Sequence, residues 1–145
     1  MDLQTKTTTY GVGDYRWLRS SANTGTAVPC TIPVTDLIEA RHYPAGVLRS
    51  GTLLSKYTSG ANSGLFGVTA LNATDGRQTP VGVLLEDVPL RKAAGGALVA
   101  TRIVGAVLLL PLLVDVSFMP PITNDSDDTA HTVVLANLPA HIKAV

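Results

Sequence analysis

Glycine and proline residues divide the chain into short apolar, β-branched segments, and their spacing is the feature that most limits how the chain can fold. Turn dipeptides such as Asp75-Gly76 separate segments that have the length of strands rather than of helices. Short strands at regular spacing with such turns are typical of a compact, mostly β domain. The strands are expected within residues 31–40, 47–57 (with a kink at Ser50-Gly51), 65–71, 79–88, 98–104, 105–118 (divided near Pro111) and 142–145.

One short helix is expected near the C-terminus. The acidic segment 124–128 can cap it, because carboxylates near the first amides suit the helix dipole, and Pro139 ends it. Four apolar residues fall on one helical face of this segment: Ala130, Val133, Val134 and Leu138. We therefore predict a mainly β (α+β) fold, a small barrel-like or sandwich-like domain with one or two short helices.

Residues 1–27 differ from the rest because they are rich in Thr, Ser, Gly and Asn. Such a segment buries too little apolar surface to offset its ordering entropy. We therefore predict a flexible, extended N-terminal arm, residues 1–27, followed by a single β-rich domain, residues 28–145.

The arm nevertheless holds the only Trp of the chain. Two interpretations are open: the aromatic residues fold back onto the body, as an edge strand, or they anchor the arm on another subunit. Trp, Tyr and Arg dominate the energetics of binding surfaces, which suits the second interpretation. The candidate contact residues are Tyr10, Tyr15, Arg16, Trp17, Leu18 and Arg19.

The charge balance bears on the class of partner. The chain has 11 Lys and Arg against 11 Asp and Glu, which argues against a nucleic-acid partner, because such proteins need a basic face. Charged residues make up only 15% of the chain and apolar residues 46%, which favours a subunit that hides surface in an assembly.

No membrane segment is expected. The longest apolar run, residues 103–114, is interrupted by Gly105 and Pro111 and is shorter than the ~20 residues of a spanning helix. The polar N-terminus lacks the pattern of a signal peptide. We expect a protein that is made in the cytoplasm and has no membrane partner.

The sequence predicts no catalytic residue, no metal site and no cofactor. The three histidines, His42, His131 and His141, form no pair with metal-ligand spacing. The lone Cys30 makes neither a disulfide framework nor a cysteine zinc site. The acidic segment 125–128 lacks the glycine and glutamate that complete a calcium loop, and no Ser lies in a G-x-S-x-G elbow. We therefore do not expect an enzyme.

Three segments in order carry a family resemblance. Residues 42–56 contain a kinked Ser-Gly-Thr strand, residues 64–67 a Gly-rich turn, and residues 75–88 an Asp-Gly turn before a Thr-Pro-Val-Gly-Val-Leu strand. This arrangement resembles the head decoration (capsid cement) proteins of tailed phages, the lambda decoration protein family. The segments that begin at Gly105 and at Leu138 are similar to the actinobacterial-phage branch. The resemblance covers about residues 31–145.

The resemblance implies a homotrimer on the outer surface of the expanded phage head. There it would bind the major capsid protein and stabilise the capsid lattice against internal pressure. In the family an N-terminal arm becomes ordered against the shell, and residues 1–27 match that role by position and composition. The protein would be made in the host cytoplasm and reside in the virion.

Two other classes stay open. A different virion part, such as a tail or baseplate β module, would also be apolar, neutral and oligomeric. A small-molecule-binding β-barrel would use apolar strands to line a pocket. The location on the particle separates the first from a decoration protein, and a filled interior would remove the second.

Overall fold

The computed structural model describes residues 14–19, 24–109, 112–123, 130–131, 133 and 138–144. One short α-helix and many short strands make up these residues. The 3-10 turns are η1 (Thr24–Thr26), η2 (Val34–Asp36) and η3 (Val116–Phe118), and the helix is α1 (Glu39–His42). The strands are β1 (Val28–Pro33), β2 (Val47–Leu48), β3 (Leu53–Lys56), β4 (Phe66–Val68), β5 (Pro80–Leu84), β6 (Val88–Pro89), β7 (Arg102–Leu108), β8 (Leu112–Val114), β9 (Ile122–Thr123), β10 (Ala130–His131) and β11 (Ile142–Ala144).

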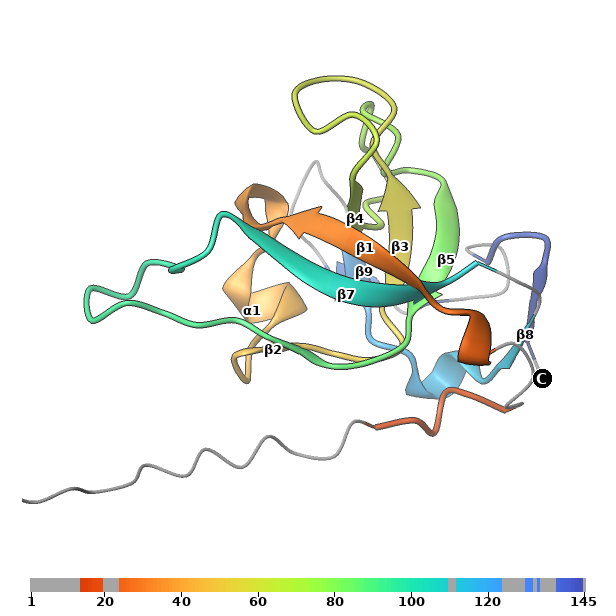
Figure 1. The fold of residues 1–145 in the computed structure, drawn as a ribbon. Coiled ribbons are helices and arrows are strands. Elements are labelled where there is room, and N and C mark those ends of the chain that lie inside the picture. The colour runs from red at the N-terminus through yellow and green to blue at the C-terminus, as the bar shows by residue number, and fades with distance from the viewer. Residues whose placement is uncertain are drawn as a thin grey trace, which may run out of the picture.

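The largest element is a five-stranded antiparallel sheet in the order β1-β7-β5-β3-β4 (Figure 1). Its two edge strands, β1 and β4, lie close together without pairing, so the sheet is strongly curved but does not close into a barrel. The predicted mainly β fold is confirmed. Three smaller two-stranded pairs complete it: β2 with β6, β9 with β10, and the parallel pair β8 with β11.

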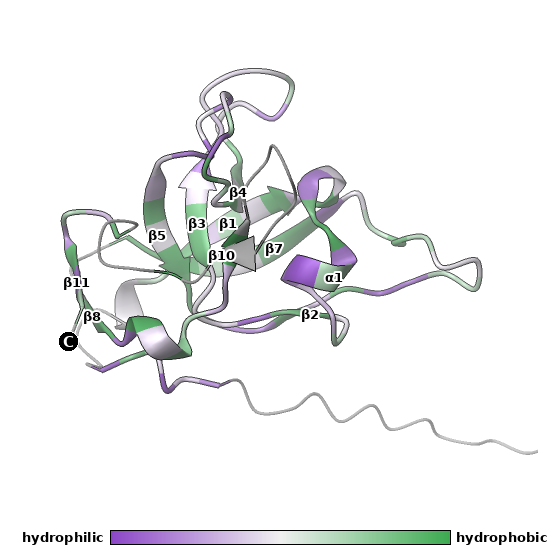
Figure 2. Cartoon of the chain, turned by 180° about the vertical axis from the view of Figure 1, so that it is seen from behind, coloured by the Kyte–Doolittle hydropathy of each residue, from purple (hydrophilic) through white to green (hydrophobic). Residues whose placement is uncertain are grey.

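The main sheet is buried on both faces over part of its area. Neighbouring residues on one strand point to opposite faces, so Leu53 and Leu54 enter two different cores, as do Val107 and Leu108. A strand that is buried on both faces has a continuous apolar sequence instead of alternating apolar and polar residues. This explains the long apolar stretch around β7. The strands of the sheet are correspondingly coloured largely hydrophobic in Figure 2, in contrast to α1.

The first core lies between the sheet, β2, β6 and the segment around α1. It includes Ile32, Tyr43, Leu48 and Leu84. The second core covers the opposite face at one end of the sheet and includes Trp17, which comes from outside the predicted body.

Several predicted elements are wrong in detail. The strand expected over 31–40 ends at Pro33, after which Val34 donates to Thr101, and residues 39–42 form one helical turn instead. The strand expected over 98–104 begins only at Arg102. The helix expected from Ala130 is a strand there, because Ala130 and His131 pair with β9. Tertiary pairing thus overrides the helical periodicity. The other positions of that helix fall outside the described residues, except Val133 and Leu138, which are not helical.

Candidate interaction surfaces

A short segment before β1, residues 14–19, lies against the body. We call it the strap. Leu18 forms an isolated antiparallel bridge with Val114 of β8. Arg19 donates its N–H to the carbonyl of Leu113 at 3.0 Å, and Asp115 donates its N–H to the carbonyl of Trp17 at 2.7 Å. The strap therefore extends the small β8–β11 sheet by one strand-like contact.

The side chain of Trp17 is completely buried in the second core. Its indole Nε1–H donates to Ser50 Oγ at 2.9 Å, and Ser50 Oγ in turn donates to the carbonyl of Leu85 at 2.7 Å. The indole lies directly on Gly51, whose φ is +88°. A Cβ at that position would lie 2.7 Å from the indole Cδ1, so only glycine fits under the ring. The Ser50-Gly51 kink and the indole are complementary parts of one site.

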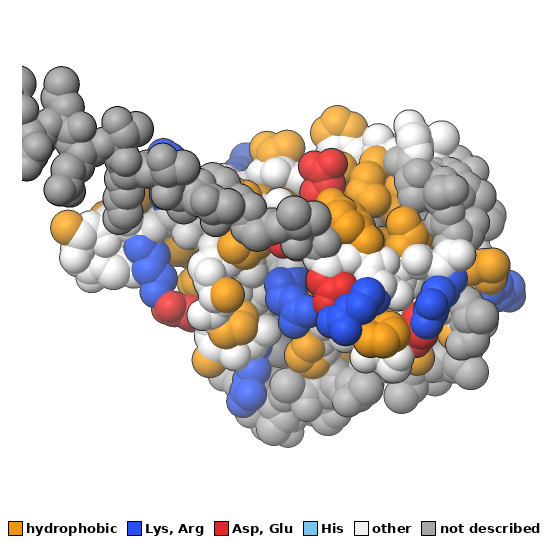
Figure 3. Space-filling view, turned by 90° about the horizontal axis from the view of Figure 1, so that it is seen from below, with side chains coloured by type: hydrophobic (Ala, Val, Ile, Leu, Met, Phe, Trp, Pro, Cys, Tyr) orange, Lys and Arg blue, Asp and Glu red, His pale blue; other side chains and the backbone are white. Residues whose placement is uncertain are grey.

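Ion pairs hold the polar side of the strap. Arg16 pairs with Asp14 at 2.6 Å, and Arg19 pairs with Asp115. The Arg16 guanidinium also lies 4.6 Å from the centroid of the Phe118 ring, a cation–π contact. Figure 3 shows basic and acidic side chains side by side on this underside of the molecule.

These contacts lower the pKa of both strap-side carboxyl groups. Hydrogen bonds from Arg16 bring the pKa of Asp14 down to about 2. Hydrogen bonds from Ser117 and then from Arg19 bring the pKa of Asp115 down to about 2 as well. Both carboxylates therefore stay ionised in the folded protein well below the pH at which ordinary aspartates become protonated.

The predicted contact residues divide into three groups. Tyr10 lies outside the described residues, and Trp17 and Leu18 are held by the body itself. Tyr15, Arg16 and Arg19 remain exposed, with 40% of Tyr15 accessible. Of the two interpretations of the arm aromatics, folding back onto the body is the one that the structure gives for residues 14–19. Trp17 is part of a core and, in this conformation, cannot contact another subunit.

A second surface feature is a hairpin, residues 89–101, that joins β6 to β7 and projects from the body (Figure 1). Lys92 bridges to Leu98, and Val99 donates its N–H to the carbonyl of Arg91 at 2.9 Å. Residues 91–97 are all exposed. Lys92 pairs with Glu39, whereas the sequence has no acidic residue between Asp87 and Asp115. The hairpin is therefore a basic protrusion.

An apolar hollow of about 140 Å³ lies at the base of this hairpin. It is lined by Val34, Pro89, Leu90, Arg91, Leu98, Val99, Ala100 and Ile103. Val99 on its rim is 66% exposed. Pockets for drug-sized ligands enclose roughly 300–1,000 Å³, so this hollow is too small for one but large enough for part of a protein side chain.

A buried polar cluster connects β3 to η2 and to the turn before β5. The Tyr57 hydroxyl donates to Asp36, and Arg77 pairs with Asp75 at 3.0 Å while lying 5.4 Å from the Tyr57 ring centroid. Burial, reinforced by Asp36, raises the pKa of Tyr57. The phenol thus stays protonated and serves as a hydrogen-bond donor that joins the two segments. No sequence pattern indicates this cluster, because Asp36, Tyr57 and Arg77 are far apart in the chain.

The histidines occupy separate places. His42 is buried, and its Nδ1 accepts the N–H of Ile38 at 2.8 Å, which caps the single turn of α1. The Nε2 of His141 is buried without a hydrogen-bond partner in the described part of the chain. Within that part, no group of three or more His, Cys, Asp or Glu side chains gathers as a metal site.

Comparison with protein-family models, curated proteins and solved structures finds no match for this chain. Across the residues described, no helix has the length and apolar character needed to cross a membrane.

Proposed function

We propose that this chain is a capsid decoration (cement) protein. It would bind the outer surface of the expanded phage head as a trimer and stabilise the lattice of the major capsid protein. The observation that carries the proposal is the order of the three family-like segments together with their position in the fold. They contain β2 and β3, the start of β4, and β5 with the turn before it. β3, β4 and β5 are neighbours in the main sheet, so the resemblance follows one continuous structural unit.

The shape of the surface also supports a binding role. A cement protein needs contact area, strand edges and apolar contacts rather than a reactive centre. The two edges of the main sheet, β1 and β4, lie close together, so the support comes from exposed apolar side chains. These are Tyr15, Val28, Val99, Val104 and Leu113.

The closed strap changes which residues are assigned to the capsid contact. Because Trp17 fills the second core, residues 14–19 act as the attachment of the N-terminal segment to the body. We assign the capsid contact to residues 1–13, including Tyr10, and to the exposed side chains of Arg16 and Arg19. In a trimer three such segments act together, so weak single contacts gain through effective concentration.

Co-sedimentation with purified, expanded head shells that lack this protein tests the proposal. We expect the full chain to pellet saturably with the shells. A chain that lacks residues 1–13 keeps Trp17 and the strap, and we expect it to bind at least tenfold more weakly. Removal of residues 1–27 would be uninformative, because it would also take Trp17 out of the core. Failure of the full chain to pellet contradicts the proposal.

A tail or baseplate module is the alternative within the same class. It would share the β fold, the neutral charge and the exposed apolar residues, so its place on the particle separates the two. Gold-labelled antibody against this chain should decorate heads of intact particles over their whole surface. Labelling confined to tails would favour the alternative.

A further inference from the structure

The hairpin carries one cation at the apolar hollow. Arg91 lines the hollow and is exposed. Within the described residues it forms no ion pair with a carboxylate. We call the hollow together with Arg91 the hairpin surface. It combines an apolar floor with unneutralised positive charge.

The opposite combination occurs beside the strap. Glu86 is exposed and Asp87 is half-buried, and no Lys or Arg in the described part of the chain forms an ion pair with either. Asp87 accepts the N–H of Ser50 at 2.7 Å, and Ser50 Oγ accepts the indole N–H of Trp17, so the strap and this acidic turn lie together. Burial, and then the negative charges of Glu86 and Asp87, raise the pKa of Tyr15 in the strap.

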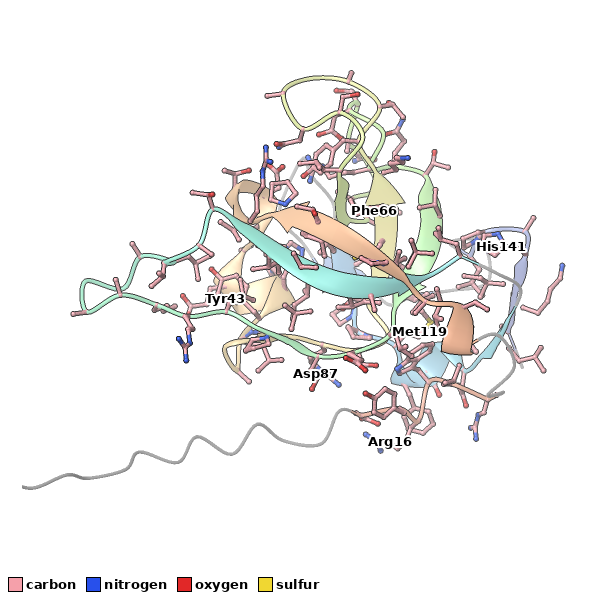
Figure 4. The ribbon with its side chains drawn as sticks, viewed as in Figure 1. Arg16, Tyr43, Phe66, Asp87, Met119 and His141 are labelled. Atoms are coloured by element: carbon pink, nitrogen blue, oxygen red, sulfur yellow. The ribbon has the colours of Figure 1, made fainter. Side chains whose placement is uncertain are left out.

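We call Tyr15, Glu86 and Asp87 the acidic surface. It presents part of an aromatic ring next to two carboxylates. Figure 4 shows Asp87 on the underside of the body, in the same region as Arg16 of the strap, whereas the hairpin projects to one side. The two surfaces share no residue.

We propose that the hairpin surface of one copy of this chain binds the acidic surface of a second copy. The exposed part of the Tyr15 ring covers the hollow, and Arg91 meets Glu86 and Asp87. This assignment rests on the self-association that the proposed function requires, and it names the surfaces that produce it.

Size and charge both fit this occupant. An apolar cavity of about 150 Å³ accepts a ring the size of benzene, and the hollow is of that order. Arginine pairs with carboxylates through parallel hydrogen bonds and stacks on aromatic faces, so Arg91 finds suitable groups on the acidic surface. Contact also removes Val99 from water.

The geometry of the contact determines the type of assembly. Two different surfaces meet, so the contact is heterologous, and each subunit retains one hairpin surface and one acidic surface for its neighbours. Such contacts produce a ring when the rotation closes. A trimer of this kind has three identical contacts and no unused surface.

Sedimentation equilibrium of the full chain and two one-sided variants tests the proposal. Ala100→Trp fills the hollow at an exposed position, and the double variant Tyr15→Lys, Glu86→Lys places cations opposite Arg91. Lys143→Glu, at an exposed position on β11, is the control for an unrelated charge change. Circular dichroism and the unfolding midpoint establish that each variant is folded.

We expect the wild type and Lys143→Glu to sediment as a species larger than a dimer. Each one-sided variant should be a monomer at the same concentration, with self-association at least tenfold weaker. An equimolar mixture of the two variants should give a dimer, because one intact hairpin surface still meets one intact acidic surface. The wild-type assembly should also weaken with added salt, since charges contribute at its rim.

Three results overturn the proposal: a monomeric wild type, one-sided variants that keep the wild-type mass, or a wild-type assembly that stops at a dimer. The shell-binding experiment keeps the two proposals apart. A chain that binds shells but assembles without these surfaces contradicts only the interface. A chain that assembles through these two surfaces but does not bind shells contradicts only the decoration role.

Discussion

The strap and the hairpin are two segments outside the main sheet, and they differ in how their contacts are satisfied. The strap buries Trp17 completely and pairs Arg16 and Arg19 with carboxylates of its own chain. The hairpin leaves Val99 66% exposed and Arg91 without a carboxylate partner among the described residues. The strap is thus part of the folded body, whereas the hairpin presents an exposed apolar side chain and an exposed cation to a partner.

This difference shows why residue type alone does not identify a binding surface. Trp and Arg are enriched at interfaces, but the same chemistry serves a core when the chain supplies its own partners. For the strap the partners are Ser50, Gly51 and Asp115. Stability measurements should therefore respond strongly to changes in the strap and weakly to changes in the hairpin.

The largest expected effect is that of Trp17→Ala. Loss of a fully buried indole removes its burial energy and leaves a cavity, which costs about 3–5 kcal/mol. Urea denaturation followed by circular dichroism measures it. Tyr15→Ala in the same segment is the control, and we expect a loss below about 1 kcal/mol because that ring is 40% exposed. Equal losses for the two variants would contradict the closed strap.

Gly51→Ala should have the next largest effect. Its φ of +88° disfavours any side chain, and the new methyl group would overlap the indole of Trp17. We expect a loss of about 1–3 kcal/mol, typical of overpacking. The double variant with Trp17→Ala is the sharper test. Without the indole the clash disappears, so the double variant should lose less stability than the sum of the two single-variant losses. Strict additivity would mean that the two residues are not in contact.

Acid should loosen the strap. The pKa values of Asp14 and Asp115 are about 2, below their ordinary value of 3.8. A depressed carboxyl pKa contributes stability that is present above the unfolded pKa and disappears as the pH falls through the folded one. Unfolding free energy should therefore fall between about pH 4 and pH 2. Asp115→Asn should reduce this fall, whereas an unchanged profile would show that Asp115 does not support the strap.

The smallest effect is expected in the hairpin. Val99→Ser removes apolar area from a side chain that water already reaches, so the unfolding free energy should change by no more than about 0.5 kcal/mol. The same substitution should weaken self-association. A large loss of stability instead would place Val99 in the core of the folded subunit and remove the contrast with the strap.

Turn and kink residues made much of the fold predictable. The kink at Ser50-Gly51 separates β2 from β3 as expected, and β11 occupies the predicted C-terminal strand. The Asp75-Gly76 turn precedes β5. These features depend on residues next to one another in the chain, whose backbone preferences follow from their residue types.

The strap could not be predicted in the same way. The site of Trp17 is assembled from Ser50, 33 residues away, and from the second core. The composition of residues 1–27 gives no sign of this docking, since it is dominated by Thr, Ser, Gly and Asn. One signal was present: an arginine on each side of the only Trp, which indicated a contact but not whether the partner was internal.

The fluorescence of Trp17 tests the central claim most directly, because it is the only Trp in the chain. With the strap closed, dilute protein should show the blue-shifted emission of a buried indole and resist quenching by acrylamide. Both properties should disappear on unfolding in urea. Red-shifted emission and ready quenching in the folded, dilute protein would mean that the strap is open, and the assignment of Trp17 to the body's own core would be wrong.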